Sequence, residues 1–180
     1  MTHSITSEPI FRRDWEAAEL VASNPLRYSD RSKQHAFGLV LPPGAVHRGR
    51  VELTRWAPSA LPEQVEGASS MAVRAEPTPY TYRLVGDPGR VREWHVNFAD
   101  AALFFGYGMW LLAQDELQVL EHPALAAVRE ALLREDRSQA RTLDGGRPTP
   151  VLISGVERRC SVSTARDAAA GRPGGLYGRA

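Results

Sequence analysis

Two neighbouring acids, Asp115 and Glu116, lie within an apolar helical pattern and could perform acid–base chemistry. On a helix, the residues three and four positions away from Glu116 are all apolar. They are Leu112, Ala113, Val119 and Leu120, and Met109 lies two turns back on the same side. A glutamate at the centre of such a stripe loses hydration, so we expect its pKa to rise. Its carboxyl group would then hold a proton near neutral pH, as general acid–base catalysis requires.

Asp115 lies one step round the same helix, next to the polar Gln118, which predicts that the acid pair faces the rim of a cleft. Patterning alone leaves a second interpretation open. Glu116 could form a structural ion pair with an arginine such as Arg158. Buried ion pairs also shift the pKa of an acid, so a perturbed acid is not by itself a catalyst.

The elements that must position these acids are a long helical pattern, a glycine-containing loop before it and several strands. The helical pattern begins at about Met109, pauses at His122-Pro123 and continues to about Glu135. Gly106 and Gly108 precede it, and a glycine loop that leads into a helix N-terminus favours anion binding.

Other local patterns predict the remaining elements. A short helix is expected over residues 14–22, and a buried strand over 151–153. Residues 57–79 are expected to form a surface loop, and 136–150 a linker with a turn at Asp144-Gly145-Gly146. Further strands are predicted at residues 36–41, 50–56, 80–85 and 92–98, the last two as a hairpin.

Composition excludes several classes of protein. With 180 residues, 43% of them hydrophobic, and a formal charge of +1, the chain fits one globular domain without an obligatory polyanionic partner. Cys160 is the only cysteine, so a disulfide within the chain or a cysteine-rich zinc site is impossible. The histidines form no HxxxH or HExxH pair, and no apolar run reaches about 18 residues. We therefore expect a cytoplasmic protein with no metal, no cofactor and no membrane partner.

Two segments match a known pattern: Val96-Asn97-Phe98-Ala99-Asp100, and the run from Gln114 to Leu125 that begins Gln-Asp-Glu-Leu. This pair resembles the signature of the poly(ADP-ribose) glycohydrolases, a branch of the macrodomain fold. That family has a strand V-D-F-A-N and a catalytic helix Q-E-E-I-R-F-x-x-x-P-E-L, at the same spacing. A later segment, residues 152–157, resembles the family's I-T-G-x-E. The resemblance covers about residues 94–164.

The resemblance implies an α/β fold, a macrodomain-like mixed sheet flanked by helices. It also implies a hydrolase that cleaves an O- or N-glycosidic bond of ADP-ribose conjugates, in which Glu116 protonates the leaving group and then activates water. Asp115 would orient the ribose hydroxyls. The partner would be ADP-ribose, or a protein or nucleic acid that carries it. Residues implied to bind the ligand are Asn97, Asp100, Phe104, Phe105, Gly106, Gln114, Ser154 and Gly155.

The chain also departs from this family. The family's run of three glycines, which approaches the diphosphate, aligns with Phe104, Phe105 and Gly106. The family's aromatic loop aligns with residues 158–164, which contain no aromatic residue. These departures keep a second function open: a macrodomain that binds ADP-ribose or another nucleotide without turnover, or an incomplete fragment.

Length is the third departure, because the strands that end the family's sheet have no counterpart after residue 165. The expected organisation is an N-terminal helical or extended segment at 1–35, a macrodomain-like domain at 36–165 and a flexible tail at 166–180. The sheet would then lack its C-terminal strands. Either the chain is a truncated product, or an open sheet edge pairs with a second copy to form a homo-oligomer.

Overall fold

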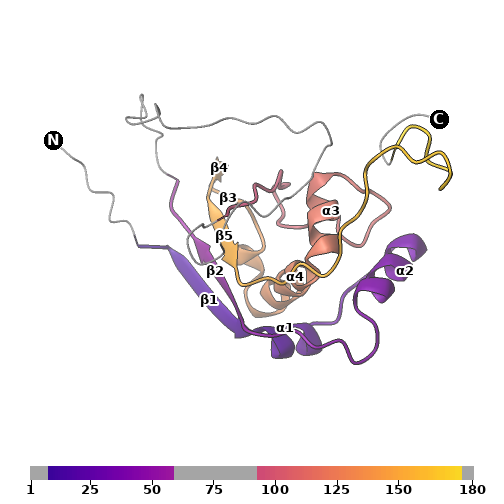
Figure 1. Ribbon diagram of the computed structural model, residues 1–180. Helices are drawn as coiled ribbons and strands as arrows, with labels where there is room; N and C mark the ends of the chain where they lie inside the picture. Colours follow the sequence, from indigo (N-terminus) through magenta and orange to yellow (C-terminus); the bar gives the residue numbers. More distant parts are fainter. Residues whose placement is uncertain (1–7, 59–92, 176–180) are drawn as a thin grey trace. The chain divides into compact units, whose positions relative to one another are not determined.

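A computed structural model describes residues 8–58 and 93–175 of the chain (Figure 1). The described residues 8–58 and 97–161 belong to one compact unit, and residues 93–96 and 162–175 belong to a second. Helices and small antiparallel sheets alternate along the first unit, which confirms the predicted mixture of α and β structure. Every strand pairing in the described residues is antiparallel, so the expected mixed sheet is not seen there.

The main sheet has three strands in the order β1-β2-β5 (Figure 1). These are β1 (Phe11–Glu16), β2 (Arg50–Arg55) and β5 (Val151–Ser154). The central strand alternates as its sequence predicts, with Val51 and Leu53 fully buried. Leu53 lies opposite Ile153, so the strands predicted at 50–56 and 151–153 are confirmed.

The burial predicted for the last strand is wrong. We expected residues 151–153 to be buried on both faces, but β5 is an outer strand and Leu152 is exposed. A continuous run of β-branched and aliphatic residues does not separate a central strand from an outer strand that covers the edge of a small sheet.

The first helix is shorter than predicted. Residues 14–16 were expected to begin it, but Trp15 and its neighbours pair with β2 as the end of β1. Helix α1 (Ala17–Ser23) follows directly and buries Ala17 and Leu20. It ends where the Asn24 side chain donates a 2.7 Å hydrogen bond to the carbonyl of Leu20, just before Pro25.

The strand predicted at residues 36–41 is wrong, because these residues belong mainly to helix α2 (Arg31–Val40). The Asp30 carboxylate caps this helix by accepting a 2.9 Å hydrogen bond from the backbone N–H of Lys33. Lys33 and Phe37 are four residues apart and both buried, which is helical rather than strand spacing. The prediction began at Ala36 and so missed both the cap and the first turn.

Two helices follow the glycine-containing loop, α3 (Gln114–Glu121) and α4 (Ala124–Glu135). The predicted break at His122-Pro123 and the predicted end at Glu135 are confirmed. The predicted start at Met109 is wrong, because the first helical residue is Gln114. The Glu116 side chain accepts a 2.8 Å hydrogen bond from the N–H of Ala113 and thereby caps the helix at that residue.

The segment predicted as a linker contains short regular elements. A 3-10 helix, η2 (Arg137–Gln139), leads to a small hairpin of β3 (Leu143–Asp144) and β4 (Arg147–Pro148). Its turn is the predicted one: Gly145 and Gly146 have φ of 54° and 80°, the left-handed conformation that a two-residue hairpin turn requires.

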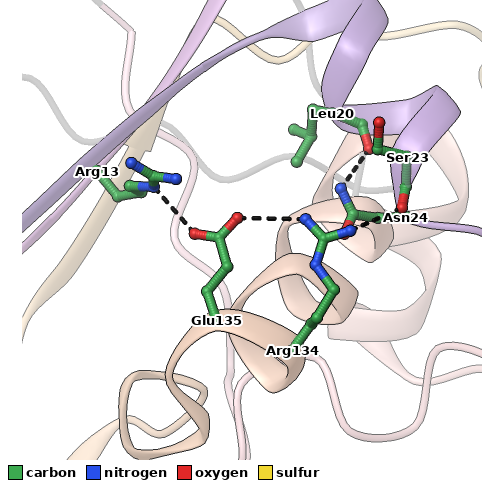
Figure 2. A network of polar contacts seen from close by, with 6 residues as sticks. All are labelled: Arg13, Leu20, Ser23, Asn24, Arg134 and Glu135. Carbon is green, nitrogen blue, oxygen red and sulfur yellow. Dashed lines mark hydrogen bonds and ion pairs between the residues drawn. The ribbon is translucent and has the colours of Figure 1, made fainter.

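A polar network joins β1, α1 and α4 (Figure 2). Glu135, at the end of α4, accepts hydrogen bonds from Arg13 at 3.0 Å and from Arg134 at 3.3 Å. Arg134 also donates to the carbonyl of Ser23 at 2.9 Å. Partial burial raises the pKa of Glu135, but Arg13, together with Trp15 and Arg134, outweighs that effect, and the pKa falls below its ordinary value. The network therefore fixes the end of α4 against the first strand and helix while the carboxylate stays charged.

The second unit is described in two short pieces. Within it, residues 167 and 172 form an antiparallel bridge, supported by an Asp167–Arg172 ion pair of 3.7 Å. Residues 80–92 of the predicted hairpin, and the predicted loop from residue 59 onward, lie outside the described residues. Residues 93–98 carry no strand, so the end of that hairpin is not formed as predicted.

Across residues 8–58 and 93–175, no helix combines the length and the apolar character needed to span a membrane.

Candidate functional site

Helix α3 carries the acid pair in its first turn, and all eight of its residues are buried. Glu116 is 3% exposed and Asp115 is 8% exposed. Acids are favoured at this position because the positive end of the helix dipole lies there. The burial predicted for Glu116 is confirmed, whereas Asp115, which we expected at the rim of a cleft, is buried as well.

Each carboxylate oxygen of Glu116 has a defined neighbour. One oxygen, Oε2, accepts the hydrogen bond from Ala113 that caps the helix. The other, Oε1, lies against Gly106, where an added Cβ would stand only 2.1 Å away. The structure thus brings Gly106 and Glu116 together, and a side chain at position 106 would displace the carboxyl group.

Asp115 is the acid with a raised pKa. Burial is the main cause, and a hydrogen bond to the Glu116 side chain and its negative charge add to it, raising the pKa of Asp115 to about 6. Near pH 6 Asp115 is therefore present in both its protonated and its ionised form, so it can give or take a proton, as acid–base catalysis requires.

The motif around Asn97 contacts the same helix. Gln114 accepts a 2.9 Å hydrogen bond from the backbone N–H of Phe98, and Asn97 donates through Nδ2 to the Gln118 side chain at 2.8 Å. The Oδ1 atom of Asn97 is buried and has no hydrogen-bond partner among the described residues. The two matching segments, far apart in sequence, are thus joined by polar contacts.

Asp100 is placed differently from its predicted role. Its carboxylate accepts a 3.0 Å hydrogen bond from the N–H of Ala102, and its carbonyl accepts one of 2.7 Å from Thr142. These contacts cap a turn next to the β3–β4 hairpin and do not involve α3. Asp100 is exposed, so it remains accessible to a ligand.

Phe104 and Phe105 divide between core and surface. Phe104 is buried and has a φ of 53°, a left-handed conformation that is rare for a bulky residue. Phe105 is half-exposed, and the guanidinium of Arg129 lies 5.6 Å from the centre of its ring. The backbone at position 104 therefore has the conformation that a glycine would adopt, with a side chain added.

Ser154 and Gly155 contact the sheet rather than the acid pair. Ser154 pairs with Glu52 of β2, and Gly155 has a φ of 78°. A Cβ at position 155 would stand 1.9 Å from the carbonyl oxygen of Arg50, so the close approach of β2 requires glycine there. In the described residues, no hydrogen bond or ion pair joins these two positions to α3.

The arginine considered as a partner for Glu116 pairs with another acid. Arg158 contacts the Glu121 carboxylate at 2.8 Å and 3.0 Å, and Glu121 is fully buried. The backbone N–H of Arg159 also donates to the carbonyl of Glu121 at 2.8 Å. The ion pair therefore secures the C-terminal end of α3 and leaves the acids of the first turn to other partners.

Lys33 is the site residue that sequence analysis missed. It is 5% exposed and donates from Nζ to the carbonyl of Tyr107 at 3.3 Å, in the loop that precedes α3. Burial lowers the pKa of Lys33 below its ordinary value, and the charges of Glu116, Asp115 and Asp30 offset only part of that effect. It is the only lysine in the chain. The presence of a single lysine and the helix cap at Asp30 were the sequence signals for this residue. They were overlooked because a strand was predicted from residue 36.

No group of three or more His, Cys, Asp or Glu side chains in the described ranges is arranged to hold a metal ion. No protein-family model, curated protein or solved structure matches the chain. The evidence for a functional site is therefore the geometry of this region: a buried acid pair, a glycine against one carboxylate and a buried lysine.

Proposed function

We propose that this chain is a glycosidic hydrolase that acts on ADP-ribosylated macromolecules, with Glu116 as general acid and base. The observation that carries the proposal is the buried Asp115–Glu116 pair at the start of α3, with Glu116 Oε1 against Gly106. Desolvated carboxyl groups that share a proton suit a reaction in which a proton is first given and then taken.

In the proposed reaction, the bond between the anomeric carbon of the ribose and the leaving oxygen or nitrogen breaks. Glu116 donates its proton to the leaving atom, and its carboxylate then accepts a proton from the water that attacks the anomeric carbon. The products are free ADP-ribose and the unmodified macromolecule, and Glu116 regains its proton. Asp115 would hold the ribose hydroxyls beside Glu116, whose carboxylate is fixed by its hydrogen bond from Ala113.

The loop before α3 supports the same proposal. Phe104 keeps a left-handed backbone where the glycohydrolase signature has glycine, and Gly106 fits the Glu116 carboxylate. Gln114, a residue of that signature, and Asn97, which stands where the signature has aspartate, lie on one hydrogen-bonded framework with α3. We include cytoplasmic location in the proposal, on the basis of the single cysteine.

A macrodomain-like fold belongs to the proposal as well. In the described residues β1 and β5 are the outer strands of the sheet, which supports pairing of a sheet edge with a second copy. A second candidate function, binding of ADP-ribose without turnover, is favoured by one observation: the half-exposed Phe105 occupies the loop where small residues would admit the diphosphate.

The test compares Glu116→Gln with the wild type in two assays, release of ADP-ribose from a mono-ADP-ribosylated protein and thermal stabilisation by free ADP-ribose. The amide retains the shape of the side chain but cannot transfer the proton, so we expect release to fall by at least about 100-fold while stabilisation persists. Glu19→Gln is the matched control, because it places the same amide at an exposed position of α1, away from the acid pair.

Equal release by the wild type and Glu116→Gln would contradict the role of Glu116. Stabilisation by ADP-ribose without release from any substrate would favour the binding-only alternative. If ADP-ribose neither stabilises the wild type nor is released by it, both functions are wrong.

A further inference from the structure

A buried cation lies in the layer next to the acid pair. Helix α2 contacts α3, and Lys33 projects from the first turn of α2 to the carbonyl of Tyr107 at 3.3 Å. Tyr107 directly follows Gly106, the residue that lies against Glu116 Oε1. The path from the lysine ammonium to the Glu116 carboxylate therefore runs through two consecutive residues of one loop.

The other charged groups around this loop have contacts of their own. Arg129 of α4 donates to the carbonyl of Leu103. Asp30 accepts the backbone N–H of Lys33 and caps α2. Glu130 of α4 accepts a 2.8 Å hydrogen bond from the Tyr107 hydroxyl and forms a 3.2 Å ion pair with Arg27. Tyr28 and Tyr107 have pKa values raised above their ordinary value by burial and stay neutral near pH 7.

The charge of Asp30 also acts on Lys33. Lys33 and the acid pair are the buried charged groups that interact across this loop. Asp115 and Glu116 are both buried, and two adjacent carboxylates in a desolvated site repel each other. Without a cation, both would tend to be protonated, because neither charge would be compensated. With one buried ammonium group nearby, a single negative charge is stabilised and the second carboxyl group keeps its proton.

We propose that Lys33 is a positioning residue for the Asp115–Glu116 pair: its ammonium group, held by the Tyr107 carbonyl, maintains the pair with one proton and one negative charge. The effect of Lys33 on the charge of the acid pair is argued from the contacts above, whereas its consequence for catalysis rests on the proposed function. A singly protonated pair contains the donor and the acceptor that the glycosidic reaction needs, so Lys33 sets the pH range in which the pair is competent without touching the substrate.

The experiment follows the side-chain carboxyl carbons of Asp115 and Glu116 by NMR during a pH titration, with signals assigned from Asp115→Asn and Glu116→Gln. In Lys33→Met the positive charge is absent, and we expect ionisation of the pair to move upward by about 1 pH unit or more. Lys33→Arg retains the charge and should restore the wild-type titration. Arg31→Met is the matched control, since it removes an exposed positive charge from the same helix and should leave the titration unchanged.

A measurement on the wild type keeps the test independent of whether Lys33→Met folds. Because the chain has one lysine, its ammonium signal can be followed without ambiguity. The proposal requires a charged ammonium group at pH 7, and a neutral amine at that pH would overturn it. Identical titrations of the acid pair in the wild type and folded Lys33→Met would overturn it as well.

The pH profile of ADP-ribose release separates this inference from the proposed function. If both hold, the profile moves upward in Lys33→Met by the same amount as the carboxyl titration and returns in Lys33→Arg. If the titration moves but no variant releases ADP-ribose, the proposed hydrolase is wrong and the role of Lys33 for the acid pair stands.

Discussion

Helices α3 and α4 follow each other in the chain and are both buried, but different interactions hold them. The buried residues of α4 are almost all alanine, leucine or valine, with Glu130 as the exception. The buried face of α3 includes five polar residues. They are Gln114, Asp115, Glu116, Gln118 and Glu121. One helix is stabilised by apolar packing, whereas the other depends on hydrogen bonds from the loops around it.

The polar residues of α3 are matched by partners from elsewhere in the chain. Residues 97 and 98 bond to Gln118 and Gln114, and Arg158 pairs with Glu121. A buried polar group costs about 1–3 kcal/mol when its partner is lost, so each contact also fixes the position of the helix. Helix α4 therefore supports the fold through apolar packing, while α3 keeps polar groups in the interior, where each needs a partner.

The largest effect on stability should come from the apolar helix. Leu132 of α4 is 1% exposed, and Leu132→Ala should lower the free energy of unfolding by about 2–5 kcal/mol, because it removes buried methyl groups and leaves a cavity. Leu39→Ala is the matched control, since Leu39 is 71% exposed on α2 and should change stability by less than about 0.5 kcal/mol. Urea denaturation measures both, and equal losses in the two variants would contradict the assignment of α4 to the core.

Sequence patterns predicted these two helices unequally, for a physical reason. The apolar stripe of Leu125, Val128 and Leu132 predicted α4 and its end correctly, because a helix buried by apolar packing shows this periodicity in its sequence. The start of α3 was placed five residues too early, at Met109 rather than Gln114. The apolar residues before Gln114 continue the periodicity, but the Glu116 side chain takes the Ala113 N–H and ends the pattern there.

The same contrast applies to the site. The helical spacing of apolar residues around Glu116 located the buried acids, since a polar residue within an apolar stripe is visible from local spacing. Lys33 was invisible to that method, because its approach to the loop before α3 depends on how α2 packs on α3. Ser154 and Gly155 were predicted to bind ligand, but their observed contacts are with β2, and tertiary pairing of this kind leaves no periodic signal.

The next largest effect on stability should depend on pH and should come from Asp115 of α3. The folded-state pKa of Asp115 is about 6 against an ordinary value of 3.8, so the folded chain binds the proton more tightly than the unfolded chain. The stabilisation is therefore complete below about pH 4 and is lost as the pH rises through 6, by about 1–3 kcal/mol. Asp115→Asn should remove this contribution, because an amide does not titrate.

The measurement is the difference in free energy of unfolding between the wild type and Asp115→Asn, taken by urea denaturation at several values from pH 4 to pH 7. Acids away from the pair titrate alike in both proteins, so the difference reports the ionisation of Asp115 together with its coupling to Glu116. We expect the wild type to lose stability relative to the variant as the pH rises. A difference that stays constant across the range would show that Asp115 ionises normally and that the polar face of α3 is not desolvated.

The smallest effect on stability should come from the glycine that fits against α3. An alanine Cβ at position 106 would stand 2.1 Å from Glu116 Oε1, so Gly106→Ala must move the end of that side chain away from its cap at Ala113. Because a carboxyl group can rotate, we expect a loss of only about 1 kcal/mol, together with a fall in ADP-ribose release of about 100-fold through misplacement of the acid.

Gly38→Ala is the matched control, since no atom lies within 4 Å of its Cβ and alanine favours the α2 helix. Its stability should rise by up to about 1 kcal/mol with release unchanged. Thermal unfolding and the release assay measure both variants, and unchanged release in Gly106→Ala would mean that the position of the Glu116 carboxylate does not control the reaction.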